Sequence, residues 1–334
     1  MSAAEPVRVM SFADLEGESI PGAPALDADR IAREAPQETW AIRGASGRID
    51  ARGSIWWRAL PPRGDRQPGY IGHYAARAAA AGGRLLDHLC DRLAAEECTE
   101  AIGPIDGSTW RAYRLVIERG AEPEFLFDLS HPADWPDHFR AAGFTVLAEY
   151  VSTVIDDLSR DDPRLARVSA RMQALGVRIR TFAPERARDE LRALHELSLV
   201  AFRHALLFSP IALSDFLDVY RPWLSAIDPR HILMAEHEGR LAGVVFSTPD
   251  LRERAAGRPL RTLVVKTLAV RPDRRYAGLG ALLLSESHRI AREAGLARAI
   301  HALMHVSNES RALSGHWQGR PIRRYALFTR RLAP

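Results

Sequence analysis

The segment 260–280 constrains the fold of this chain more than any other. Its first part, LRTLVVKTLAV, is a nearly continuous apolar run, as expected of a central strand buried on both faces. Its second part, Arg275-x-x-Gly278-x-Gly280, places residues without side chains directly before an amphipathic helix predicted over 279–295. The free amides at such a helix start attract an anion such as a pyrophosphate. Arg271, Arg274 and Arg275 add positive charge for a further phosphate.

Two other glycine-loop signatures do not fit this segment. A dinucleotide fingerprint needs its glycines directly after the strand, a third glycine, and an acidic residue about 20 residues further on. Here several residues intervene and the third glycine is absent. A Walker loop needs Gly-Lys followed by Ser or Thr, which is also absent.

Composition excludes several classes of protein. The 334 residues are 46% hydrophobic and 26% charged, which suits about two globular domains and excludes disordered, collagen-like and coiled-coil chains. No run of 18 apolar residues and no signal-like N-terminus is present, so we expect a cytoplasmic protein without a membrane partner. The net charge is +4, Lys266 is the only lysine, and the arginines are scattered, so no nucleic-acid partner is expected. Cys90 and Cys98 are too few for a disulfide framework.

The chain divides into two similar halves at a turn-rich, charged stretch over 156–163. We therefore predict domains at 1–158 and 159–334, called below the first half and the second half. In the second half we predict helices over 186–202 and 214–224, a hairpin over 231–248 that turns at Glu238-Gly239, and strands over 177–182, 297–304 and 323–332. A short helix is expected over 307–317.

The first half repeats this order more loosely. We predict a hairpin from 38–42 and 48–57, strands over 69–75, 99–105, 123–129 and 144–155, and helices over 82–95 and 108–116. Asp106-Gly107-Ser108 corresponds in position to Asn308-Glu309-Ser310, and each is expected to begin a helix with Asp or Asn as its cap.

The second half resembles the GNAT superfamily of acyl-CoA-dependent N-acyltransferases. RYAGLG at 275–280 matches the family motif Arg/Gln-x-x-Gly-x-Gly/Ala at every specified position, and LAVRPDRR before it is similar to the end of the family's fourth strand. Asn308 matches the asparagine that commonly follows the fifth strand, and Gly319 matches the glycine before the final strands. The resemblance covers about 177–332.

The resemblance implies a mixed α/β fold of two tandem GNAT-like domains, each a twisted, mostly antiparallel sheet flanked by helices. It also implies transfer of an acyl group, acetyl by default, from acyl-CoA to a small-molecule or peptide amine by direct attack, without a metal. The residues that it places against CoA are Leu268, Ala269, Val270, Arg275, Tyr276, Ala277, Gly278, Leu279, Gly280 and Asn308.

The catalytic groups are less well defined. Many family members carry a glutamate where this chain has Lys266-Thr267, and a tyrosine where it has Gly315. His305 and His316 are candidate proton relays, and Tyr325 is a candidate acid, while Lys266 is a candidate partner of a substrate carboxylate. Asn308 completes this set. Each of these side chains also has an ordinary structural interpretation.

The first half lacks the complete motif, although Gly82-Gly83 stands before a predicted helix. It either supports the second half and shapes the acceptor site, or binds a second CoA. Its aromatic and histidine side chains fit either an acceptor or acyl pocket or a strand core: Trp56, Trp57, Tyr70, His73, Tyr74, Trp110 and Tyr113. Two other functions remain open, a non-catalytic acyl-CoA-binding or regulatory protein and an aminoacyl-tRNA-dependent transferase.

Overall fold

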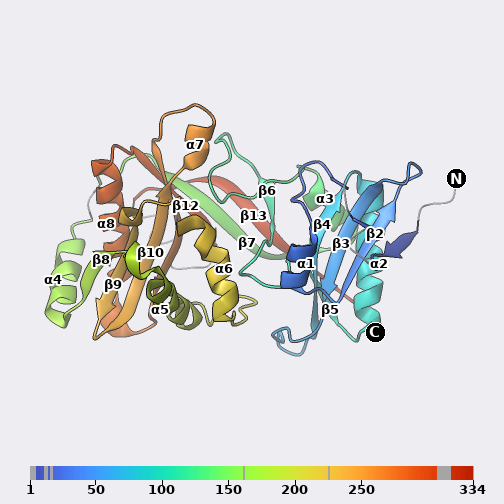
Figure 1. The fold of residues 1–334 in the computed structure, drawn as a ribbon, viewed down its shortest axis with the longest axis horizontal. Helices are drawn as coiled ribbons and strands as arrows, with labels where there is room; N and C mark the ends of the chain where they lie inside the picture. Colours follow the sequence, from blue (N-terminus) through green and yellow to red (C-terminus); the bar gives the residue numbers. More distant parts are fainter. Residues whose placement is uncertain are drawn as a thin grey trace.

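A computed structural model describes residues 5–10, 14–15, 18–160, 162–224, 226–306 and 317–333. Within these ranges the protein is a mixed α/β structure, in which a 13-stranded sheet is flanked by helices on its faces (Figure 1). The first half, blue to green, and the second half, green to red, form two lobes at the ends of the molecule. No helix in the described ranges is long and apolar enough to cross a membrane.

The sheet runs in the order β1-β2-β3-β4-β5-β13-β7-β12-β11-β10-β9-β8, and β6 pairs with β13 beside this path. The strands of the first half are β1 (Pro6–Arg8), β2 (Glu38–Arg43), β3 (Ile49–Trp56), β4 (Pro68–Ala76), β5 (Glu100–Gly103), β6 (Leu115–Glu118) and β7 (Thr145–Ile155). Those of the second half are β8 (Arg178–Thr181), β9 (Ile232–His237), β10 (Arg240–Pro249), β11 (Thr262–Val270), β12 (Arg298–His305) and β13 (Arg320–Arg331).

The helices are α1 (Ala28–Glu34), α2 (Ala79–Ala95), α3 (Trp135–Ala141), α4 (Leu165–Leu175), α5 (Ala187–Ala201), α6 (Leu213–Leu224), α7 (Leu251–Ala255) and α8 (Leu279–Glu293). Short 3-10 turns occur at η2 (Pro184–Arg186), η3 (Pro229–His231) and η4 (Arg274–Tyr276). Both halves share one succession of elements. Antiparallel strands lead into β4 or β11, and a helix, α2 or α8, then returns the chain to a parallel neighbour, β5 or β12.

Two strands join the halves. β13, from the end of the chain, lies between β5 and β7 of the first half, with Phe328 opposite Gly103 and Val146. β7 in turn lies between β13 and β12, with Ile155 opposite Ala299. The sheet is therefore continuous from one half to the other.

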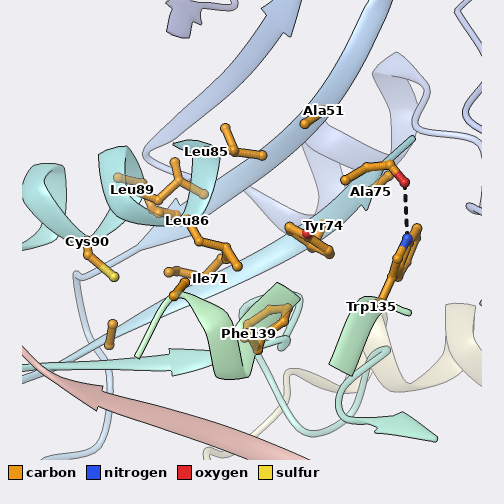
Figure 2. Close-up of a cluster of buried hydrophobic side chains, with 14 of the residues drawn as sticks. Ala51, Ile71, Tyr74, Ala75, Leu85, Leu86, Leu89, Cys90, Trp135 and Phe139 are labelled. Carbon is orange, nitrogen blue, oxygen red and sulfur yellow. Dashed lines mark hydrogen bonds between the residues drawn. The ribbon is translucent and has the colours of Figure 1, made fainter. Parts of the chain in front are cut away.

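Each half has a core between its sheet and its long helix. In α2 the leucines at 85, 86, 89 and 93 are fully buried, as helical spacing predicts, and they pack on β3 and β4 with Ile71 and Phe139 (Figure 2). In α8 the buried face includes Leu279 and Leu283, as predicted. The helix was predicted to extend to residue 295, but it ends at Glu293, and Ala294 is exposed because Gly295 turns the chain away.

The structure corrects two elements predicted for the first half. Residues 108–114 are not helical; the chain turns there and then enters β6. Residues 123–129 are not a strand but a loop, although Phe125 is almost completely buried. In both segments an apolar pattern reflects burial against distant parts of the chain rather than a regular local structure. Helix α3 was not predicted. The helix expected over 307–317 lies outside the described residues except for Trp317.

Candidate active site

The glycine turn joins β11 to the start of α8. Asp273 caps the η4 turn by accepting a hydrogen bond from the Arg275 amide at 2.9 Å, and its carboxylate also pairs with the Arg275 side chain at 2.7 Å. Gly278 has φ +82° and is the N-cap of α8. Only glycine adopts this conformation without strain, and a Cβ there would lie 3.0 Å from Val168 of α4.

This turn leaves the start of α8 open. Gly278 carries no side chain, so no cap hydrogen bond occupies the first amides of the helix. Arg274 and Arg275 are exposed beside it. Arg271, expected to add charge for a ligand, instead donates from Nε to the Leu241 carbonyl at 2.7 Å. The free amides, the helix dipole and two accessible guanidinium groups form a site that fits a phosphate or pyrophosphate.

The other turn residues predicted to contact CoA differ in whether their side chains or only their main-chain groups are accessible. Tyr276 is buried, and its hydroxyl is hydrogen-bonded to His237 Nδ1 at 2.8 Å. Leu279 is also fully buried, whereas Ala277 offers its backbone carbonyl to Arg171. Gly280 follows in the first turn of α8 and is half-buried. The turn therefore presents main-chain groups and Arg275 to a ligand, but neither the Tyr276 nor the Leu279 side chain.

β11 and β12 diverge beside this turn. They pair as parallel strands only from Thr262 opposite Arg298 to Val265 opposite His301. Beyond that point no described residue pairs with 266–270 on the β12 side, although β10 still pairs with 267–270 on the other side. The diverging ends, 266–270 and 302–305, are called the splay below. Leu268, Ala269 and Val270, the residues predicted to lie against CoA, belong to the splay, where an extended ligand can hydrogen-bond to the strand.

Lys266 lies at the inner end of the splay. It forms a bulge, because Phe246 of β10 faces Thr267 while Ser247 faces Val265. Its ammonium lies 5.3 Å from the centre of the Phe127 ring, which comes from the first half. The side chain is accessible to solvent but surrounded by protein atoms. This desolvation, together with the positive charge of Arg114, lowers the pKa of Lys266 to about 8.

His305 and Tyr325, both predicted as catalytic, have different surroundings. His305 ends β12 in the splay, edge-on to Tyr150 at 5.0 Å between ring centres, and burial and Arg114 lower its pKa. Tyr325 is fully buried in β13 and donates to Asp128 at 2.9 Å; its hydroxyl also lies 3.0 Å from Ser152 Oγ. This position argues against Tyr325 as a proton donor to substrate. Asn308 and His316 lie outside the described residues.

The sequence analysis did not identify Tyr220 as a site residue. Its hydroxyl on α6 is hydrogen-bonded to the side chain of Thr267 in the splay, and burial raises its pKa. An aromatic group around it joins α6 to loops of the first half, with Phe127 against Trp223 at 4.8 Å and Trp110 against Phe216 at 5.9 Å. No local motif marks Tyr220, because its relation to the splay arises only from packing.

In the first half the corresponding strand edge is occupied by the protein itself. β4 and β5 separate after Tyr70, but the Ile105 amide donates to the Ile71 carbonyl at 2.8 Å. Further along, Trp135 Nε1 donates to the Ala76 carbonyl at 3.1 Å (dashed in Figure 2). A Cβ at Gly72 would collide with the Ile105 carbonyl, so the loop lies directly against β4.

Asp106 belongs to this loop and does not cap a helix, contrary to the prediction. It is buried, accepts from the His73 amide at 2.6 Å and pairs with Arg30 at 2.6 Å. Glu34 lies 2.5 Å from His73 Nε2 and also pairs with Arg30. The ligand atoms of Glu34, His73 and Asp106 lie within 4.8 Å of one another, as a metal site requires. The Arg30 guanidinium pairs with both carboxylates, at 3.3 Å from Glu34 and 2.6 Å from Asp106, so this arrangement is that of a partly buried ion-pair network.

The other first-half features divide between two roles. Tyr74 packs in the core around α2. Trp56, Tyr70 and Tyr113 belong to a cluster that also contains Tyr325 and Leu327 of the second half, and Trp110 donates to the Ser209 carbonyl of the second half. Gly82 is needed for packing, because a Cβ there would collide with the Tyr74 hydroxyl. Cys90 and Cys98 are buried free thiols.

Several solved structures are similar in fold to this chain. A GCN5-related N-acetyltransferase from Sphaerobacter thermophilus is 17% identical with a TM-score of 0.50, over 96% of this chain and 84% of that one. A tandem GNAT protein from the clavulanic acid biosynthesis pathway is 16% identical with a TM-score of 0.51, over 99% of both chains. A probable N-acyltransferase from Enterococcus faecalis V583 is 10% identical with a TM-score of 0.59, over 99% of this chain and 73% of that one.

At these identities the likeness shows the fold alone. The family is indicated by the sequence, because residues 191–313 match the Acetyltransferase (GNAT) family. This range includes β11, the glycine turn and α8. The chain therefore contains a GNAT acetyltransferase domain in its second half. No curated protein matches the chain.

Proposed function

We propose that this protein is an acyl-CoA-dependent N-acyltransferase, with acetyl-CoA as the default donor, that acylates a small-molecule or peptide amine. In this proposal the second half, 159–334, binds acyl-CoA, and the first half, 1–158, supports it and completes the acceptor side. The observation that carries the proposal is the splay of β11 and β12 directly beside the glycine turn of α8. One extended ligand with a phosphate group at one end fits both.

The chain's own residues supply the remaining functions. Acyl-CoA, when bound, supplies an activated thioester. The open edge of β11 at 268–270 aligns the extended ligand, and a main-chain amide there stabilises negative charge on the reacting carbonyl oxygen. Loss of one such donor typically costs about 3 kcal/mol. The amides of α8 and Arg275 hold the phosphate end.

Two titratable groups at the splay suit proton transfer. Burial lowers the pKa of His305, so its imidazole is neutral at pH 7 and can accept a proton from the attacking amine. Burial raises the pKa of Tyr220, so its hydroxyl keeps its proton and can donate it to the departing sulfur. Thr267 orients that hydroxyl.

A thiol-release assay with acetyl-CoA and a panel of amines tests the proposal. We expect release by the wild type and its loss in Gly280→Glu, which places a carboxylate at the phosphate site. The matched control is Gly83→Glu, in the helix of the first half, where a Cβ meets nothing within 4 Å. Equal loss in both variants, or binding of acetyl-CoA without turnover of any amine, would contradict the proposal. The second result would favour a non-catalytic acyl-CoA-binding protein.

A further inference from the structure

Lys266 is the only lysine among the 46 lysine and arginine residues of the chain. Its position is equally unusual, since it forms the bulge of β11 at the inner end of the splay. Arginine carries a permanent charge on a planar fork, whereas lysine carries a compact charge that can be lost. Every other basic position of this kind is an arginine, and the one lysine ammonium lies beside the proposed acceptor site.

A second cation, Arg114, reaches the same place from the first half. Its guanidinium lies between two rings, 3.8 Å from the centre of Tyr113 and 4.1 Å from that of Tyr150. Nη1 donates weakly to the Leu303 carbonyl in the splay, at 3.4 Å. Nε is buried and has no hydrogen-bond partner among the described residues. The two rings are perpendicular to each other, so the guanidinium packs in the corner between them, and its Nε edge is left without a hydrogen bond to any described residue.

Neither cation has an anionic partner in the part of the chain that the structure describes. Desolvation lowers the pKa of Lys266, and the positive charge of Arg114 lowers it further. His305, which contacts Tyr150, is a further titratable group of the splay, and burial and Arg114 lower its pKa. Two like charges held together without a counter-ion are costly, and a bound anion would remove that cost.

The backbone around Lys266 supports a functional interpretation. Arg114, Phe127 and Leu303, which all border the site, have φ values of +70°, +68° and +56°. Non-glycine residues in this region carry strain, which is retained where it positions functional groups. The first half and β12 both contribute such residues at this one point.

We propose that the acceptor is an amine that also carries an acidic group, a carboxylate or a phosphate, which Arg114 and Lys266 bind together. This inference rests on the proposed function and names the substrate class of the same site. The guanidinium offers the fork that matches either acid, and the ammonium adds a point charge. The site differs from the phosphate site of the glycine turn, which follows β11 beyond Val270, whereas Lys266 lies at the inner end of the splay.

The single lysine allows a direct test without turnover. In protein labelled with 13C-lysine, the side chain gives one NMR signal, whose pH titration we expect to have a midpoint near 8. In the presence of CoA, N-acetylglycine or inorganic phosphate should raise that midpoint by about one pH unit or more, and acetamide should not. If only N-acetylglycine raises the midpoint, the acidic group of the acceptor is a carboxylate, and if only inorganic phosphate raises it, the group is a phosphate. Arg114→Met should raise the midpoint of the free protein and weaken the anion effect. A midpoint that neither anion moves would overturn the inference.

A kinetic test uses matched acceptors. Amino acids are compared with their amides, and O-phosphoethanolamine with ethanolamine. We expect the acidic member of one pair to be preferred at least tenfold in kcat/KM, and Lys266→Met to remove most of that preference by raising KM. Lys266→Arg should retain it, because the charge remains.

Three results are distinguishable. Equal turnover of the acidic and neutral members would overturn the inference while leaving the acyltransferase in place. Loss of kcat in Lys266→Arg with unchanged KM would also overturn it, because Lys266 would then be a proton acceptor. Absence of turnover with every amine would contradict the proposed function, and the NMR titration would still decide whether the cations bind an anion.

Discussion

A pair of histidines is buried between α8 and β12, behind the splay. His288 Nε2 lies 3.1 Å from His301 Nε2, and the Trp317 ring packs edge-on against His288 at 5.3 Å between ring centres. Burial lowers the pKa of His288 to about 4 and that of His301 well below its usual value, with a further contribution from His288 to the latter. Both imidazoles are therefore neutral in the folded protein.

These histidines predict acid sensitivity. The unfolded chain binds a proton at each imidazole near pH 6.5, but the folded protein does so only at a much lower pH, so the unfolded state binds more protons in between. The free energy of unfolding should fall as pH decreases from about 6.5 toward 4, by about 1 kcal/mol per histidine at pH 5.5. Urea denaturation at pH 7.5 and 5.5 measures this loss.

The double variant His288→Met/His301→Met is the control. It should show a smaller loss between the two pH values, with a remainder from His131, whose pKa burial also lowers to about 4. Equal stability of the wild type at both pH values would contradict this assignment.

At the residue scale the sequence predicted main-chain features better than side-chain roles. The glycine motif and the turn at Glu238-Gly239 follow from local patterns, and the turn has φ +50° and +73° as expected. The surroundings of Tyr325 could not be predicted, because its hydrogen bond goes to Asp128, which is 197 positions earlier in the chain. Arg114 and Tyr220 were not identified because segments distant in sequence bring them to the splay.

At the scale of elements, the two halves differ in what lies along the corresponding edges of β4 and β11. In the second half no described residue pairs with the β12 side of β11 beyond Val265. In the first half the loop after β5 and Trp135 of α3 hydrogen-bond to carbonyl groups of β4. Asp106 holds that loop, since it binds both the His73 amide and Arg30. Among the described residues, the edge of β4 that corresponds to the splay is thus contacted by the protein itself.

Removal of the Asp106 carboxylate tests this role. Asp106→Ala leaves Arg30 without one of its two partners and the His73 amide without an acceptor, so we expect a loss of about 3 kcal/mol in the free energy of unfolding. Asp134→Ala is the matched control, because its carboxylate is 58% exposed and pairs with His138 at 3.2 Å. That variant should lose less than about 1 kcal/mol. Equal losses would show that Asp106 is not a structural centre of the first half.

The elements that the sequence mispredicted lie in this same loop region. The pattern at 108–116 suggested a helix, yet Trp110 faces the second half and donates to the Ser209 carbonyl at 2.8 Å. The apolar run at 123–129 suggested a strand, yet Phe127 packs on Trp223 of α6. Contacts between the halves determine these segments, and local periodicity carries no information about such contacts.

At the scale of the molecule, the exchange of β7 and β13 makes the halves interdependent. The neighbours of β7 are β13 and β12, both from the second half, and β13 also pairs with β5 of the first. The sequence indicated the repeated order of elements, but it could not indicate this exchange, because strand pairing between distant segments leaves no local pattern.

We expect the whole chain to unfold in one cooperative transition, followed by circular dichroism in urea. The fragment 1–158 should not fold alone, since β7 would lack both of its neighbours, and it should regain structure when co-expressed with 159–334. A fragment 1–158 that unfolds cooperatively on its own would contradict the interdependence of the halves.

The central claim is that the second half alone carries an acyl-CoA site, at the splay and the glycine turn. Isothermal titration calorimetry with acetyl-CoA tests it most directly, on the wild type, Gly280→Glu and Gly83→Glu. The account predicts one site per chain in the wild type and in Gly83→Glu, and at least a hundredfold weaker binding in Gly280→Glu. Two sites per chain, or binding that survives Gly280→Glu and is lost in Gly83→Glu, would place an acyl-CoA site in the first half and contradict the account.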